Sequence, residues 1–163
     1  MSTSSLLNRH GRNVSLFLLI AATFAVYGQI LGHGFISNWD DSAYVTDNPF
    51  AQKITWSNLR TIFSTYFVGN YAPVQMFSYM LDYAVWGGWA GGFLLTNLVV
   101  HTSNGLLFFR LLSRLHSDHL MAFFGSAVFL LHPVQVESVA WVSQRKNLLA
   151  MLFFLVAWEG YCR

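Results

Sequence analysis

The sequence predicts an all-α membrane protein with about four transmembrane or re-entrant helices and two amphipathic helices in the first outer loop. The chain is 55% hydrophobic and only 10% charged, whereas soluble domains carry roughly 25% charged residues. Its apolar runs are continuous, unlike the short alternating segments of a transmembrane β-barrel. A net charge of +2 without a basic run argues against a nucleic-acid partner. The single Cys162 excludes an internal disulfide.

The first span is expected at residues 14–32, because no charged residue lies between Arg12 and Asp40 and a bilayer core needs about 20 apolar residues. Arg9 and Arg12 precede it, so the positive-inside rule places residues 1–13 in the cytoplasm. A secretory signal peptide has the same layout. The long apolar run without a small-x-small site before Gly32 favours an uncleaved anchor.

Residues 33–90 then form an outer loop with two helices of its own. Thr55 is a candidate N-cap and Pro73 a candidate first residue of a helix. Apolar residues follow each at helical spacing, which predicts two amphipathic helices along the membrane face. These residues are Leu59, Ile62, Phe63 and Tyr66 in the first helix, and Val74, Phe77, Leu81 and Val85 in the second.

A second span is expected at residues 92–112, with Arg110 and Arg114 marking the return to the cytoplasm. Within it Asn97, His101 and Asn104 follow one another at i, i+4 and i+7, which is one stripe of a helix. Polar groups facing lipid are costly, so the stripe is expected to hydrogen-bond other helices. A ligand role for His101 is the alternative.

The third span, residues 119–131, is too short to cross as a straight helix, since its twelve-residue apolar run gives roughly 18 Å against a core near 30 Å. Residues 132–147 form a second outer loop, and residues 148–162 a fourth span. Pro133 can open a helix with Glu137 in its first turns. If that helix is continuous, Glu137, Trp141 and Arg145 share one face.

The two outer loops carry the candidate site. Asp40 and Asp41 are adjacent acids, which repel each other and contribute nothing to a hydrophobic core. Such a pair suggests a site for a proton, a metal or a sugar hydroxyl. A solvated acidic loop is the alternative. Arg145 and Lys146 lie on the side where positive residues are depleted. An anionic ligand such as a phosphate would explain them, and so would anchoring to lipid headgroups.

Several motifs together resemble the membrane O-mannosyltransferases that bear tetratricopeptide repeats, and their bacterial relatives. The resemblance covers nearly the whole chain, with the motifs in the expected order. They are NWDDSAYVTDNP at 38–49, NYAP at 70–73, LDY at 81–83, TNL at 96–98 followed by His101, and HPVQVESVAWVSQRK at 132–146.

The resemblance implies the fold of C-type glycosyltransferases, which use polyprenyl-phosphate-linked sugars. It implies that Asp40 or Asp41 orients or deprotonates the acceptor hydroxyl, with Glu137 near the reaction centre. Arg145 and Lys146 would hold the phosphate of the leaving lipid. Trp39, Tyr71, His132 and Trp141 stand in the same motifs and are expected to line the site. Metal dependence stays open, because two adjacent acids are not a sufficient signature for a divalent metal.

The first functional hypothesis is therefore the N-terminal part of a sugar transferase in a bacterial inner membrane or the endoplasmic reticulum. It would transfer mannose or a similar sugar to a protein or other hydroxyl acceptor at the outer membrane face. A non-catalytic membrane anchor or scaffold is the second hypothesis. A transporter using the His101 stripe is the third, and it has less support because the charges cluster in the outer loops. Since the resembling proteins have many more spans, this chain is expected to be a fragment, inactive on its own.

Overall fold

The structure, a computed structural model, describes residues 3–116 and 118–162, with side chains described from residue 11 onward. Part of the expected cytoplasmic segment, including the side chain of Arg9, therefore lies outside the described residues. The part described is all-α, with one isolated bridge between Phe67 and Asn70. Its helices are α1 (Thr3–Tyr27), α2 (Trp56–Ile62), α3 (Pro73–Trp86), α4 (Ala90–Leu115), α5 (His119–Leu131), α6 (Val136–Ala140) and α7 (Arg145–Tyr161).

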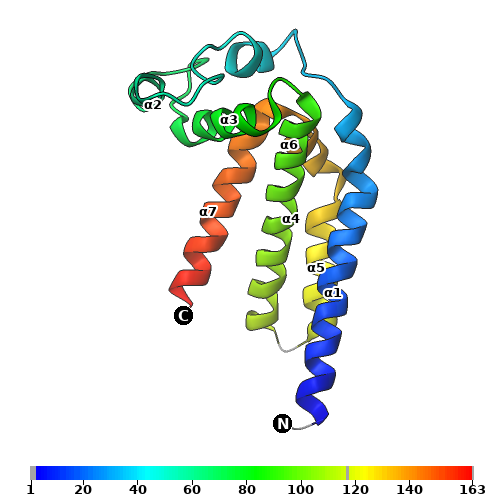
Figure 1. Cartoon of the computed structure of the whole chain (residues 1–163). Helices are drawn as coiled ribbons and strands as arrows, with labels where there is room; N and C mark the ends of the chain where they lie inside the picture. The colour runs from blue at the N-terminus through cyan, green and yellow to red at the C-terminus, as the bar shows by residue number, and fades with distance from the viewer. Residues whose placement is uncertain (1–2, 117, 163) are drawn as a thin grey trace.

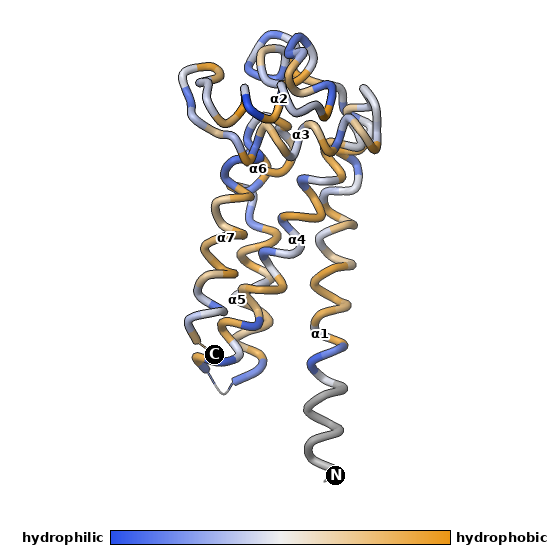
Figure 2. The backbone as a smooth tube through the Cα atoms, turned by 60° about the vertical axis from the view of Figure 1, so that its left-hand side comes forward, coloured by the Kyte–Doolittle hydropathy of each residue, from blue (hydrophilic) through white to orange (hydrophobic). Residues whose placement is uncertain are grey.

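Helices α1, α4, α5 and α7 form a bundle, and α2 and α3 lie across one end of it (Figure 1). We call this end, which carries residues 33–89, the loop end. Helix α4 is central, since it contacts α1, α5 and α7. Hydrophilic residues gather at the loop end and at the opposite end, whereas the helices between them are mainly hydrophobic (Figure 2). This distribution is the one expected of a bundle that crosses a membrane.

Among the residues that the structure describes, two helical stretches are long and apolar enough to span a membrane, Gly11–Gly32 and Ala90–Leu115. The first consists of α1 from Gly11 onward with its short continuation η1 (Gly28–Gly32). The third apolar run ends as the sequence predicts, because α5 stops at Leu131 and the helical stretch from Pro133 to Ala140 continues at an angle of 46°. This pair is either a broken span or a re-entrant loop.

The two loop-end helices begin where the sequence predicts. The Thr55 hydroxyl accepts the Asn58 backbone N–H at 3.1 Å, and Pro73 occupies the first turn of α3. The expected apolar stripe of α2 is shorter than predicted, however. Ile62 is buried, whereas Phe63 and Tyr66 come after the last residue of the helix and are exposed.

Two apolar clusters hold the bundle together. The larger one joins the loop-end layer to α4 and includes Tyr44, Met76 and Phe93. The smaller one, nearer the opposite end, packs α1, α4 and α5 around Phe109 and Leu130. The first cluster fixes the position of the first loop against the end of the bundle, where the candidate site residues lie.

Candidate functional site

The first loop and the 132–147 segment meet at the loop end through the carboxylate of Asp41. Asp41 Oδ1 accepts a hydrogen bond from the Ser143 backbone N–H at 3.0 Å and a second from the Ser143 hydroxyl. Asp41 Oδ2 accepts the Ile36 backbone N–H at 2.9 Å. The two segments expected to share a site are therefore in direct contact, although 102 positions separate these two residues.

The two adjacent aspartates have different surroundings. Asp41 is 1% exposed, whereas Asp40 is partly exposed. Both lie at the start of a helical turn that continues into the π-helical η2 (Ser42–Thr46). Successive residues of a helix point about 100° apart, so one carboxylate is turned into the protein and the other toward the surface. Asp40 is the member of the pair that an external molecule can reach.

The 132–147 segment is not the continuous helix on which Glu137, Trp141 and Arg145 were expected to share a face. Helix α6 ends at Ala140, and Trp141 has an extended backbone with φ −117° and ψ 119°. The short 3₁₀ turn η4 (Val142–Gln144) follows before α7 begins. The expected common face of these three residues is therefore broken between α6 and α7.

This break is stabilised by polar side chains of α3 and α4. Buried backbone groups released from a helix need other partners, and three side chains supply them. The bonds are Asn97 Nδ2 to Val139 O (3.3 Å) and Trp141 O (3.1 Å), Tyr79 Oη to Val142 O (2.8 Å) and Gln75 Nε2 to Ser143 O (2.8 Å). The irregular backbone around residues 141–144 is thus held from both helices.

Arg145 contacts groups of the protein itself, whereas the sequence predicts a phosphate as its partner. Its side chain is 0% exposed, and Nη2 lies 2.5 Å from Asp82 Oδ2. Its Nε donates to Asn97 Oδ1 at 2.7 Å, and its guanidinium lies 4.7 Å from the centre of the Tyr79 ring. The remaining contacts are Nη1 to Ser78 Oγ (3.2 Å) and Nη2 to Phe93 O (2.8 Å). A phosphate could reach it only if this network opened.

Burial changes the acid–base chemistry of this network. The pKa of Asp82 is raised above its ordinary value of 3.8 because desolvation outweighs the attraction of Arg145 and the hydrogen bond from Thr96. Burial also raises the pKa of Tyr79, against the opposing effect of Arg145. Tyr79 therefore stays a neutral donor to the Val142 carbonyl across the physiological range.

The other predicted site residues lie around the break and are more exposed. Glu137 is exposed and accepts a hydrogen bond from Gln144 Nε2 at 3.1 Å. Lys146, beside the buried Arg145, is partly exposed. Trp39 is 64% exposed and meets Trp141 edge to face, with 5.3 Å between ring centres.

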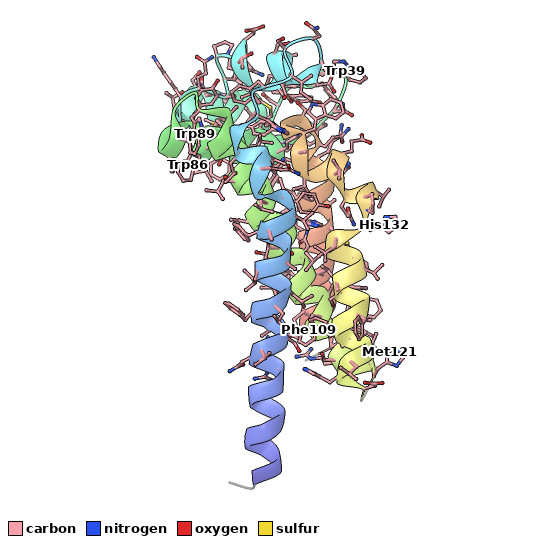
Figure 3. All side chains as sticks on the ribbon, turned by 90° about the vertical axis from the view of Figure 1, so that its right-hand side faces the viewer. Trp39, Trp86, Trp89, Phe109, Met121 and His132 are labelled. Atoms are coloured by element: carbon pink, nitrogen blue, oxygen red, sulfur yellow. The ribbon has the colours of Figure 1, made fainter. Side chains whose placement is uncertain are left out.

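The side chains of His132 and Tyr71 form hydrogen bonds with backbone groups of residues nearby in the chain. His132 Nδ1 accepts the Val134 backbone N–H at 3.2 Å, which caps the short η3 turn (Pro133–Gln135). The Tyr71 hydroxyl donates to the Phe63 carbonyl at 2.9 Å. Figure 3 shows Trp39 on the loop-end layer and His132 farther along the bundle. The structure thus brings together the tryptophans of the two loops, but it gives no contact between His132 or Tyr71 and the aspartate pair.

Sequence reasoning assigned no role to the α3 side of the site, which consists of Gln75, Tyr79 and Asp82, although Asp82 stands in the LDY motif. These residues follow one another at i, i+4 and i+7, the same spacing as the polar stripe that it found on α4. That repeated spacing on an otherwise apolar helix is the signal that could have revealed them.

The structure holds no ready-made metal cluster in the part of the chain it describes. No three His, Cys, Asp or Glu side chains among these residues are grouped closely enough to hold a metal ion.

The chain is similar over nearly its whole length to several protein O-mannosyl-transferases. It is 30% identical to "Protein O-mannosyl-transferase F38B6.6" of Caenorhabditis elegans across 88% of this chain and 22% of that protein. It is 27% identical to the human "Protein O-mannosyl-transferase TMTC3" across 90% of this chain and 16% of the relative. For the Drosophila melanogaster "Protein O-mannosyl-transferase Tmtc2" the identity is 27%, across 96% and 18%.

These similarities confirm the resemblance that the motifs predict. The chain spans only about a fifth of the length of these relatives. No protein-family model and no solved structure matches the chain.

Proposed function

We propose that this chain forms part of a membrane glycosyltransferase that transfers mannose or a similar sugar from a polyprenyl-phosphate donor. The acceptor would be a hydroxyl of a protein or glycan at the outer membrane face, where the loop end would lie. The observation that carries the proposal is the bond between Asp41 and Ser143, which joins the two motif-bearing loops. The names of the relatives support the reaction class.

Asp40 is the proposed general base. A hydroxyl that attacks a sugar carbon needs a carboxylate within hydrogen-bond reach to accept its proton, and Asp40 is the accessible member of the pair. Asp41 would position the base, because its own oxygens already bind Ile36 and Ser143. Glu137 would lie beside the acceptor at the exposed edge of the second loop.

The phosphate of the leaving lipid would be held mainly by Lys146 at the start of α7. A departing phosphate gains charge, so a fixed cation stabilises the transition state. The N-terminal end of a helix also favours an anion. Arg145 would not contact the phosphate, and its buried positive charge would fix this end of α7 in position. Trp39 and Trp141, which touch edge to face, would form a wall of the site, with Tyr71 and His132 farther out.

The test compares Asp40→Asn with Asp41→Asn and with Asp47→Asn, an exposed carboxylate of the same loop that serves as the matched control. Transfer is measured in membranes that contain the expressed gene product, a polyprenyl-phosphate sugar and a hydroxyl acceptor. Asp40→Asn should lower the rate by about 10²- to 10⁴-fold with unchanged expression and thermal midpoint. Asp41→Asn should lower both the rate and the thermal midpoint, and Asp47→Asn neither.

A non-catalytic scaffold makes a different forecast, because it needs the Asp41 bond but no accessible base. If Asp40→Asn transfers sugar at a near-normal rate, Asp40 is not the base. If the full gene product that carries this segment unchanged transfers no sugar while folding normally, the scaffold is the better hypothesis.

A further inference from the structure

A recess opens between α4, α5, α6, α7 and the short η3 turn, and one of its lining residues, Asn147, is exposed. Its volume is about 170 Å³, which corresponds to the liquid volume of about five or six water molecules. Its lining is His101, Asn104, Phe129, Gln135, Ser138, Asn147, Leu148 and Met151. None of these residues has a role in the transfer chemistry proposed above.

Two fully buried acceptors line this recess without a partner. His101 and Asn104 are both 0% exposed. Among the side chains that the structure describes, His101 Nδ1 and Asn104 Oδ1 are both without a hydrogen bond. Leaving a buried acceptor without a hydrogen bond costs roughly 1–3 kcal/mol of stability. Because two such acceptors lie on adjacent turns of one helix, a bound group that donates hydrogen bonds to them is expected.

The hydrogen bonds of the second polar atom in each side chain show whether the unpaired atom is a donor or an acceptor. His101 Nε2 lies 3.0 Å from the Leu130 carbonyl, which can only accept, so Nε2 carries the proton and Nδ1 is an acceptor. Asn104 Nδ2 donates to the Leu148 carbonyl at 2.9 Å, which leaves Oδ1 as an acceptor. Both atoms therefore require a donor.

The electrostatic properties of the recess limit the kinds of ligand that it can bind. An anion would meet two lone pairs, and the lining residues contain no acid to balance a cation, whose uncompensated burial is expensive. Apolar walls from Phe129, Leu148 and Met151 complete the recess. We propose that the recess binds an uncharged hydroxyl group, which donates to His101 Nδ1 and Asn104 Oδ1. The hydroxyl would come from ordered water or from a bound sugar, and only the second source depends on the proposed glycosyltransferase function.

The test is the ¹⁵N resonance of His101 Nδ1 in the full chain, labelled at histidine and held in lipid nanodiscs. The resonance is assigned by its absence in His101→Asn. Spectra are recorded in buffer alone and with methyl mannoside, at a pH where the imidazole is neutral. We expect an upfield shift to the value of an acceptor nitrogen that receives a hydrogen bond. A shift already present in buffer and unchanged by the sugar identifies water, and one that appears on adding methyl mannoside identifies a sugar hydroxyl.

Ser138→Leu places an apolar side chain in the recess and leaves both acceptor residues unchanged, and Ser103→Ala, whose hydroxyl bonds only within α4, is the matched control. Ser138→Leu should return Nδ1 to the value of an unbonded nitrogen, whereas Ser103→Ala should leave it shifted. The proposal is overturned if Nδ1 is unbonded or protonated in both solutions, or if Ser138→Leu leaves the shift unchanged. These spectra do not depend on sugar transfer, so failure of this proposal is distinguishable from failure of the proposed enzyme.

Discussion

The two ends of the bundle each hold an arginine–carboxylate cluster, and the two clusters differ chiefly in burial. At the loop end Arg145 and Asp82 lie 2.5 Å apart, with side chains 0% and 6% exposed. At the opposite end Glu159, whose side chain is 12% exposed, pairs with Arg110 at 2.7 Å and with Arg114 at 2.8 Å, and these arginines are 54% and 35% exposed. The distances are similar, and the exposure of the arginines is the clearest difference between the two clusters.

That difference predicts opposite energetics for similar geometry. Exposed ion pairs contribute about 0–1 kcal/mol, because water and salt screen them. A buried pair contributes little net stability when intact, but removing one partner leaves an uncompensated charge and costs about 3–5 kcal/mol. Disruption of the loop-end cluster should therefore lower the stability of the fold more than disruption of the other cluster.

The largest effect is expected for Asp82→Leu. It removes the hydrogen-bond acceptor as well as the counter-charge that faces buried Arg145, whereas a protonated Asp82 would still offer a carbonyl oxygen. Arginine cannot escape by losing its proton. The free energy of unfolding in detergent micelles should fall by about 3–5 kcal/mol, measured by denaturant titration. The double variant with Arg145→Met should be more stable than Asp82→Leu alone. A single-variant loss below about 1 kcal/mol would show that the two clusters are equivalent after all.

A second prediction uses the pH dependence of Asp82. Because burial raises its pKa in the folded chain above the ordinary 3.8, the folded state binds more protons than the unfolded state between these two values. Stability then falls as pH rises through that window. Relative to Asp82→Asn, which cannot titrate, the natural protein should gain stability on acidification toward pH 3.8. A relative loss on acidification, as in an ordinary exposed salt bridge, would contradict the dominance of desolvation.

The smallest effect is expected for Arg110→Gln at the opposite end. Glu159 keeps Arg114 as a partner, and an exposed pair contributes at most about 1 kcal/mol. The loss of stability should be within that limit at low salt and smaller still at high salt, in the same denaturant titration. A salt-independent loss as large as that of Asp82→Leu would mean that this cluster is buried in the membrane-embedded protein.

Features with local signals could be predicted from the sequence. Thr55 and Pro73 start their helices through interactions within a few residues, so the letters alone suffice. The stripe of Asn97, His101 and Asn104 was expected to bond other segments, and each of the three contacts a backbone carbonyl beyond its own helix.

The parts of the site that depend on distant partners could not be predicted. The sequence predicts a phosphate partner for Arg145 because its neighbours in the chain give no hint of Asp82, which lies 63 positions away. The break after α6 has no proline or glycine to announce it, and it is stabilised by side chains such as Tyr79 from another helix. Likewise, two adjacent aspartates are indistinguishable in sequence until the fold buries Asp41 and leaves Asp40 accessible.

The break between α6 and α7 also bears on how the protein is made. The side chains that bond its carbonyls, Gln75, Tyr79 and Asn97, all precede it in the chain, as does Asp41, which binds the Ser143 N–H. Chains generally fold from the N-terminus during synthesis. When residues 141–144 leave the ribosome, all of these partners have therefore already left it. The order of synthesis thus lets this irregular backbone form its hydrogen bonds as soon as it emerges.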